Sequence, residues 1–305
     1  FQMTFAIITP ALIIGAFVER IKFSAMLIFL SLWLSIVYLP VTHWVWGGGL
    51  LSSWGVMDFA GGIVVHATAG TAALVTALTL GKRRGFPKSI TPPHSPILTM
   101  IGAAMLWVGW FGFNAGSALE ANSNAGMAML VTHISAATAA LVWMAIEWKR
   151  FGKPSLIGVV TGMVAGLATV TPASGYIGIP GGLILGFFGG LLCYLAVDYI
   201  RGKLQIDDSL DVFAVHGVGG ILGSLLVAFL ATSTFLGLGL PEGQTASSQF
   251  IIQFKGVALT ICWTAVFTYL ILKLTSFIVP LRVEEEEEIE GLDLRSHGEK
   301  GYHSD

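Results

Sequence analysis

Residues 58–70 read DFAGGIVVHATAG, and residues 208–220 read DSLDVFAVHGVGG. Both stretches fit the pattern D-x6-V-H-x3-G, in which an aspartate precedes a histidine by eight residues in an apolar context. For a single histidine in such a stretch, a hydrogen bond to the carbonyl of a neighbouring helix explains its presence as well as a function does. Because ionisable groups inside long apolar segments are costly and commonly functional, the repetition favours a functional pair, His66 and His216.

The composition places this pair in a membrane protein. Of the 305 residues, 54% are hydrophobic and 11% are charged, whereas a soluble domain carries about 25% charged residues. Half of the acidic residues lie in the last stretch, 284–305. A soluble protein with so few charges would expose large apolar patches. The composition therefore disfavours soluble enzymes, nucleic-acid binders and disordered chains, and it predicts an all-α integral membrane protein.

Nine segments are apolar enough to cross a bilayer, whose core of about 30 Å requires roughly 20 apolar residues in a helix. The chain also begins inside an apolar stretch, at Phe1, so we expect it to be a fragment that lacks its original N-terminus. The predicted spans are 1–18, 24–42, 59–80, 96–116, 124–147, 155–171, 177–200, 209–232 and 248–280.

Basic residues decide the predicted orientation of these spans. Alternate connections and the tail hold 14 of the 16 Lys and Arg residues, and the remaining connections hold none. The other two, Lys255 and Lys273, lie near the ends of the ninth span, where they can snorkel. Under the positive-inside rule, the chain starts outside and its acidic tail is cytoplasmic.

The two copies of the pattern lie in the third and eighth predicted spans, so they should cross the bilayer in opposite directions. This arrangement indicates an inverted-topology repeat, which transporters use to build a site near the membrane midplane. If Asp58 and Asp208 cap their helices, each histidine lies about 12 Å deeper. The repeat therefore predicts that His66 and His216 meet near the membrane centre. Capping is the favoured role for both aspartates, over direct contact with a substrate.

Several longer motifs make the whole chain recognisable. It resembles the ammonium transporter family (Amt/Mep/Rh), most closely its bacterial and archaeal Amt branch, and the resemblance covers essentially all residues. Family members normally have eleven spans, with the histidines on the fifth and tenth, which implies that two spans preceding Phe1 are absent. The motifs are FQMTF at 1–5, HWVWGGGLL at 43–51, GWFGFNAGSA at 109–118, TPASGYIG at 171–178 and LRVEEEEEIEGLDLRSHGEKGY at 281–302.

The resemblance, and not the spacing, assigns roles to individual aromatic residues. It implies that Trp46 and Ser117 form an outer recruitment site with an aromatic wall from Phe5. It also implies that Phe5 and Phe113 form a gate of stacked rings above the twin histidines, with Asp58 as a buried carboxylate below the recruitment site. Without the resemblance, these aromatic side chains would be taken for membrane anchors or packing residues.

The implied function is ammonium uptake without enzyme activity. Ammonium would lose its proton at the gate, and ammonia would pass the twin histidines; the proton would either return outside or travel separately along the histidines. Two alternatives stay open: an ammonium-sensing receptor that conducts little, and a divalent-metal permease. Two histidines without a nearby Cys or carboxylate make a poor metal site, so neither a metal nor another cofactor is expected.

The resemblance further implies a homotrimer in the cell (inner or plasma) membrane, made of a transmembrane domain at 1–280 and a cytoplasmic acidic tail at 281–305. By composition alone, the five consecutive Glu residues at 284–288 indicate a solvated, mobile tail. The resemblance instead favours a folded tail that regulates transport and offers a surface to a PII-type nitrogen-sensing protein. No nucleic acid is an expected partner.

Overall fold

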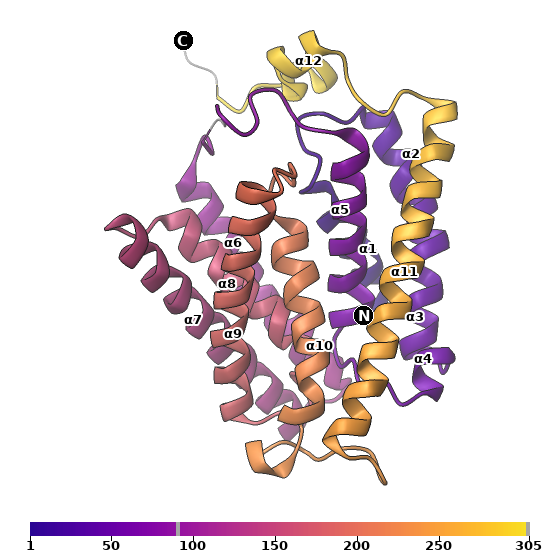
Figure 1. Cartoon of the computed structure of the whole chain (residues 1–305), viewed down its shortest axis with the longest axis vertical. Helices are drawn as coiled ribbons and strands as arrows, with labels where there is room; N and C mark the ends of the chain where they lie inside the picture. The colour runs from indigo at the N-terminus through magenta and orange to yellow at the C-terminus, as the bar shows by residue number, and fades with distance from the viewer. Residues whose placement is uncertain (90–91, 303–305) are drawn as a thin grey trace.

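The computed structural model describes residues 1–89 and 92–302, so residues 303–305 of the predicted tail lie outside the described residues. The described part is a bundle of helices that run mostly along the long axis of the molecule (Figure 1). The α-helices are α1 (Gln2–Ile14), α2 (Phe23–Trp33), α3 (Leu39–Trp46), α4 (Leu50–Ser53), α5 (Thr68–Leu80), α6 (Pro96–Asn114), α7 (Ser123–Phe151), α8 (Leu156–Val170), α9 (Ile179–Val197), α10 (Val218–Leu230), α11 (Ala246–Ile278) and α12 (Glu285–Glu290). The π-helices are η1 (Leu34–Tyr38), η2 (Gly62–Ala67), η4 (Asp198–Lys203), η5 (Phe213–Gly217) and η7 (Asp293–His297), and short 3-10 turns form η3 (Ala115–Ala118) and η6 (Ser233–Phe235).

Seven of the predicted spans correspond to continuous helices that are long and apolar enough to cross a membrane. The other two correspond to shorter apolar helices, α1 with 13 residues and α8 with 15. The chain is therefore a multi-pass membrane protein, and the exact number of its spans stays a prediction. The seven long helical segments are Phe23–Ser53, Gly62–Leu80, Pro96–Ala118, Ser123–Phe151, Ile179–Lys203, Phe213–Leu230 and Ala246–Ile278.

Side-chain caps determine where several of these helices begin. The Asn122 side chain accepts a hydrogen bond from the backbone N–H of Ala125 at the start of α7. Thr245 forms a capping box with Ser248 at the start of α11. Such caps satisfy backbone N–H groups that have no partner within the helix. Helix α7 ends at Gly152, whose left-handed φ of +77° is a conformation that glycine adopts without strain.

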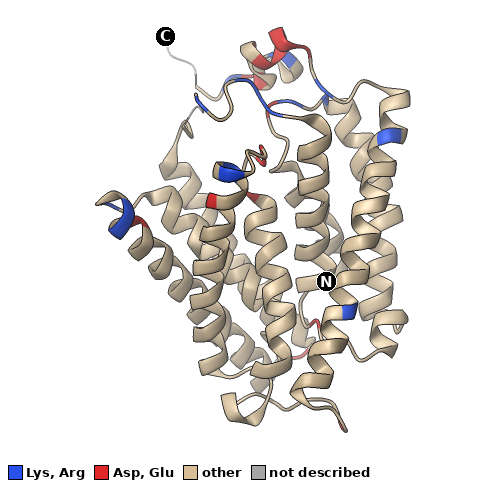
Figure 2. Ribbon diagram, viewed as in Figure 1, with Lys and Arg blue, Asp and Glu red and all other residues tan. Residues whose placement is uncertain are grey.

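The charged residues lie mostly at one end of the bundle. Figure 2 shows that Lys and Arg gather at the end that carries α12, whereas the opposite end is almost free of them. The connections at 47–61, 115–122, 171–178 and 231–245 contain no Lys or Arg. This one-sided distribution is the one that the alternating connections predict, and it is typical of a membrane protein whose basic end faces the cytoplasm.

The two histidine-bearing segments are the most enclosed of the long helical segments. In an apolar stretch of 18 residues within Gly62–Leu80, 78% of the residues are buried, and in Phe213–Leu230, 61% are. The two segments cross in close contact at glycines. A Cβ on Gly70 would lie 2.3 Å from Cα of Gly217, and a Cβ on Gly220 would lie 2.5 Å from Cβ of His66. The glycine four residues after each histidine therefore lets the two backbones approach.

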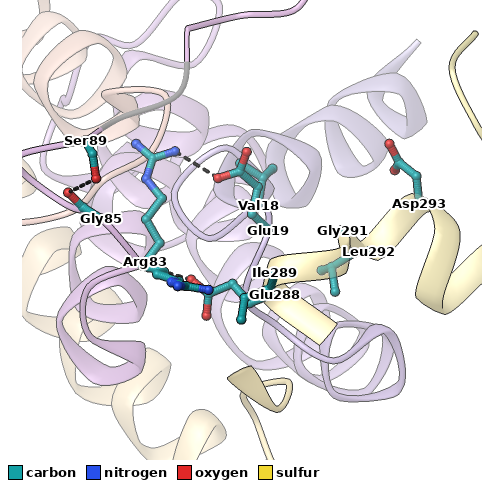
Figure 3. Close-up of a pocket in the computed structure, with 11 residues that line it drawn as sticks. Val18, Glu19, Arg83, Gly85, Ser89, Glu288, Ile289, Gly291, Leu292 and Asp293 are labelled. Carbon is teal, nitrogen blue, oxygen red and sulfur yellow. Dashed lines mark hydrogen bonds and ion pairs between the residues drawn. The ribbon is translucent and has the colours of Figure 1, made fainter. Parts of the chain in front are cut away.

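Part of the acidic tail is folded. Glutamate Glu288 on α12 is nearly buried, and its carboxylate accepts hydrogen bonds from the backbone N–H of Arg84 at 2.6 Å and from the Arg282 guanidinium at 2.8 Å. Residues of the tail and of the loop after α5 line a cavity of about 580 Å³ (Figure 3). Inside it, Arg83 pairs with Glu19 at 3.1 Å. The run of Glu residues thus forms a short helix that docks on the basic end of the bundle.

The helix crossing predicts a large effect of a single methyl group. We expect Gly70→Ala to destabilise the protein by about 1–3 kcal/mol, because the added Cβ overlaps the Gly217 backbone and forces the helices apart. The control is Gly102→Ala on α6, where a Cβ meets no atom within 4 Å. Thermal unfolding in detergent measures both variants, and equal midpoints for the two would contradict the close crossing.

Candidate functional site

A cavity of about 310 Å³ opens at the end of the bundle away from α12 and brings together three residues that lie far apart in the sequence. These residues are Phe5 from α1, Trp46 at the end of α3, and Ser117 from η3. The structure thus assembles the three side chains that the sequence analysis groups into an outer vestibule. The remaining lining residues are Phe1, Gln2, Val45, Phe59 and Leu119.

The polar groups of this vestibule are oriented by hydrogen bonds. The indole N–H of Trp46 donates to the backbone carbonyl of Asp58 at 2.9 Å, so the indole offers a guest its π face and not its N–H. The Ser117 hydroxyl donates to the carbonyl of Phe113 at 2.9 Å. Since its only proton is used in this way, its oxygen can only accept a hydrogen bond from a guest. Both groups therefore suit a cation that carries N–H donors.

Two phenyl rings separate the vestibule from the interior. The rings of Phe5 and Phe113 have centroids 4.4 Å apart and planes inclined at 51°, so the pair is tilted and not stacked in parallel as expected. The Phe5 ring also packs edge-on against Trp46 at 5.5 Å, and Phe113 stacks over His66 at 5.9 Å. Since Phe5 is 2% exposed, its ring lies buried between Trp46 and Phe113.

The two histidines lie in contact at the helix crossing. Nδ1 of His66 and Nδ1 of His216 are 3.3 Å apart, and the ring centroids are 5.2 Å apart. A hydrogen bond between two imidazole nitrogens requires that one of them carries the proton and the other accepts it. Within the described part of the chain, Nε2 of His66 is buried and has no hydrogen-bond partner. The pair therefore shares one N–H and leaves a buried polar atom free.

The carboxylate of Asp58 holds the first histidine helix in place. Its two oxygens accept four hydrogen bonds, at 2.6–3.1 Å, from the backbone N–H groups of residues 61–64 at the start of η2. A negative charge at this position also matches the positive end of the helix dipole. The turn requires Gly61, whose φ is +109°. Asp58 thus caps the helix, and its carboxylate does not face the vestibule as a free ligand.

The second copy of the pattern repeats this local structure. Asp208 is buried, and its carboxylate accepts a hydrogen bond at 2.7 Å from the backbone N–H of Phe213 at the start of η5. Asp211 has a left-handed φ of +56°, at the same distance from its aspartate as Gly61 from Asp58. In both copies the histidine lies in a π-helix, a local widening that is frequent at functional sites.

Sequence reasoning missed one aromatic residue of this site, Trp110 on α6. Its indole stacks on His66 at 5.4 Å with planes 16° apart, and its N–H donates to the Thr171 hydroxyl at 2.9 Å. The available signal was its spacing: Trp110 precedes Phe113 by three residues, which places both on one face of a helix. That spacing alone does not distinguish it from the eight other tryptophans.

A buried phenol, Tyr176, lies beside the site. Burial, with a smaller contribution from the nearby charge of Asp58, raises the pKa of Tyr176, in the connection between α8 and α9, to about 12. The phenol therefore stays protonated beside the vestibule residue Phe59, against which it packs at 5.5 Å. Among the residues that the structure describes, no three His, Cys, Asp or Glu side chains gather as a metal-binding group would.

Comparison with known proteins gives a consistent result. The sequence profile of the Ammonium Transporter Family matches residues 1–302. The chain is 48% identical over 306 residues to a putative ammonium transporter of Methanothermobacter thermautotrophicus, covering 99% of this chain and 74% of that protein. It is 47% identical to the ammonium transporter Amt1 of Archaeoglobus fulgidus, covering 99% and 76%.

Solved structures share the fold. A protein described as "Sensor Amt Protein" superposes with a TM-score of 0.90 at 32% identity, covering 97% of this chain and 76% of that chain. Mep2 of Saccharomyces cerevisiae superposes with a TM-score of 0.84 at 35% identity, covering 94% and 66%.

The four hydrogen bonds to Asp58 predict a strong effect on stability. We expect Asp58→Ala to lower the free energy of unfolding by at least about 3 kcal/mol, because each buried N–H left without an acceptor costs about 1–3 kcal/mol. Asp58→Asn keeps one carbonyl oxygen, so its free energy of unfolding should lie between those of the wild type and Asp58→Ala. Denaturation in detergent measures the loss against the exposed carboxylate variant Glu242→Ala, and matching curves for the two alanine variants would rule out the capping role.

Proposed function

Because the chain belongs to the Ammonium Transporter Family, we propose that it takes up ammonium by binding NH4⁺ in the outer vestibule and passing NH3 along the twin histidines. The chain carries the helices of a multi-pass membrane protein, and we assign it to the cell membrane with the tail on the cytoplasmic side. The charge distribution in Figure 2 supports this orientation.

The vestibule is suited to a small cation. A desolvated cation over an aromatic face gains about 2 kcal/mol or more, and the Trp46 indole offers its face because its N–H is bound to Asp58. The Ser117 oxygen adds one acceptor for an N–H of the ion. Ammonia or water lacks the charge that the indole attracts. The vestibule therefore selects ammonium before the substrate reaches the gate.

Below the phenyl gate, the charge becomes a cost. Moving an ammonium-sized ion from water into a low-dielectric interior has an idealised cost of about 20 kcal/mol. Around the histidines, the rings of Phe113 and Trp110 stack on His66 and on each other, whereas a cation channel lines its path with carboxylates or carbonyls. Ammonium therefore gives up its proton at the gate and neutral ammonia continues inward, while the proton either returns to water on the outer side or travels separately along the histidines.

The single observation that carries this proposal is the buried Nε2 of His66, which has no partner within the described part of the chain. Such a polar atom is costly to leave unbonded, and it lies below the gate rings, where a small neutral guest would pass. Because the two Nδ1 atoms share one proton, an ammonia molecule finds both donor and acceptor capacity along the pair. The free nitrogen is thus the natural contact for ammonia.

The larger assembly follows from the same family assignment. We take the two D-x6-V-H-x3-G segments as the centres of an inverted-topology repeat, supported by their matching caps and left-handed residues. A homotrimer with one pore per subunit rests on the resemblance alone. The folded tail, whose α12 docks on the basic end of the bundle, is our candidate surface for a PII-type regulatory protein.

A sensing role is the second candidate function. It is favoured by the similarity in fold to the protein described as a sensor Amt protein. A sensor could use the same vestibule and conduct little. Robust ammonium flux by the purified protein, reconstituted without any signalling partner, would favour transport over sensing.

Replacing both His66 and His216 by leucine tests the pore. We expect proteoliposomes with this double variant to lose selective ammonium flux by at least about tenfold, because the leucines remove the shared imidazole N–H and the free Nε2 of His66. Counterflow of labelled methylammonium measures the flux, with wild-type protein in matched vesicles as the control. Selective flux that is unchanged in the double variant would show that the imidazoles have no chemical role.

Removing residues 284–305 tests the tail. The helices that line the vestibule and the crossing do not include this segment, so we expect the truncated protein to keep ammonium flux within about twofold. Inhibition of that flux by an added PII-type protein should disappear, since α12 is the proposed docking surface. The assay is the same vesicle flux with and without the added protein, and undiminished inhibition of the truncated form would eliminate this surface.

A further inference from the structure

The segment at 57–61, between α4 and η2, is buried although it is neither helix nor strand. Irregular backbone at membrane depth is tolerated only where other groups satisfy its N–H and C=O groups. Two contacts outside the pattern do so here: the Phe59 N–H donates to the carbonyl of Pro172 at 3.0 Å, and the Asp58 carbonyl accepts from the Trp46 indole. The segment is therefore held by its neighbours and not by a helix of its own.

A third outside contact comes from Gln253, the eighth residue of α11. Its side-chain amide pairs with the backbone of Met57 in both directions: Oε1 accepts from the Met57 N–H at 2.7 Å, and Nε2 donates to the Met57 carbonyl at 2.7 Å. The second proton of Nε2 goes to the carbonyl of Ser224 on α10, also at 2.7 Å. With an exposure of 0%, this fully bonded amide ties α10 and α11 to the residue that precedes Asp58.

Asp58 acts on both parts of the site from this one position. Its carbonyl fixes the Trp46 indole in the vestibule, and its carboxylate caps the helix that carries His66. A shift of the backbone at Met57 would move both contacts together. We infer that Gln253 is a positioning residue for ammonium recruitment, which acts by clamping Met57 and so aiming Asp58 at Trp46 and η2. This inference rests on the proposed function.

The second copy of the pattern has a clamp of the same kind. The residue before Asp208 is Asp207, whose carbonyl accepts from the guanidinium of Arg20 at 2.5 Å. Arg20 is completely buried and also donates to the Ser209 hydroxyl at 2.8 Å. A side chain from outside the pattern thus holds the backbone one residue before each capping aspartate. Because both copies of the pattern have such a contact, we take the clamp as a part of the site and not as an isolated packing contact.

Two variants and one matched control separate positioning from general stability. Gln253→Leu removes all the amide hydrogen bonds. Gln253→Glu keeps the shape and an acceptor for the Met57 N–H but removes the donors to Met57 and Ser224, so it serves if the leucine variant does not fold. The control Thr268→Val lies on the same helix, is equally buried, and breaks the bond from the Trp33 indole at 3.0 Å without touching the vestibule.

Amide hydrogen exchange tests the clamp without reference to transport. In both Gln253 variants, we expect exchange in peptides covering residues 57–66 to be about fivefold faster or more, because opening of this segment no longer requires breaking the Gln253 bonds. In Thr268→Val, exchange of these peptides should equal that of the wild type. Unchanged exchange in the Gln253 variants would overturn the inference.

Transport kinetics test whether Gln253 affects ammonium recruitment through the position of Trp46. We expect Gln253→Leu to raise the KM for ammonium about tenfold with little change in maximal flux, since a misplaced indole weakens recruitment. In a Trp46→Phe background, whose ring lacks the N–H that reaches Asp58, the same change should alter KM less than about twofold. A full tenfold effect in both backgrounds would overturn the inference.

A wild-type protein without ammonium flux would instead contradict the proposed function, and hydrogen exchange would still decide on the clamp.

Discussion

Two imidazoles can share one proton only where their helices come close, and this close approach depends on backbone without side chains. Because Gly70, Gly217 and Gly220 have no side chains, the two backbones pack closely and the Nδ1 atoms lie 3.3 Å apart. Protein interiors pack with few voids and give way little. A single added methyl group at the crossing would therefore separate the rings. In the proposed function, the aromatic gate and the vestibule serve to deliver ammonia to this contact.

The carboxylates that precede the histidines show how the bundle tolerates broken helices. Each precedes a helix that starts after irregular backbone: the Asp58 carboxylate accepts from four backbone N–H groups, and the Asp208 carboxylate accepts from the N–H of Phe213. Outside side chains, Gln253 and Arg20, hold the residue before each aspartate. The groups that stabilise the irregular backbone are thus the same groups that orient the site, which couples stability to function.

The sequence predicts the helical membrane architecture from the length of its apolar segments and the one-sided charge from the Lys and Arg in alternate connections. It predicts the contact of His66 and His216 from the repeated pattern, whose two copies lie on spans of opposite direction. It does not predict Trp110 or Gln253, since their roles arise from contacts between helices distant in the chain. Trp46, Ser117 and Phe113 enter through the family resemblance and not through physical pattern. The tilt of the Phe5–Phe113 pair and the folded tail depend on packing that composition does not encode.

At the helix crossing, we infer that two neutral imidazoles share a single proton between their Nδ1 atoms and leave Nε2 of His66 free. Nitrogen-15 NMR of histidine-labelled protein in bilayers at neutral pH, assigned with single-histidine variants, measures this state directly. We expect one ring protonated at Nδ1, one ring accepting at Nδ1, and a coupling across the N–H···N bond. Two rings that both carry their proton on Nε2, or a ring protonated at both nitrogens, would contradict it.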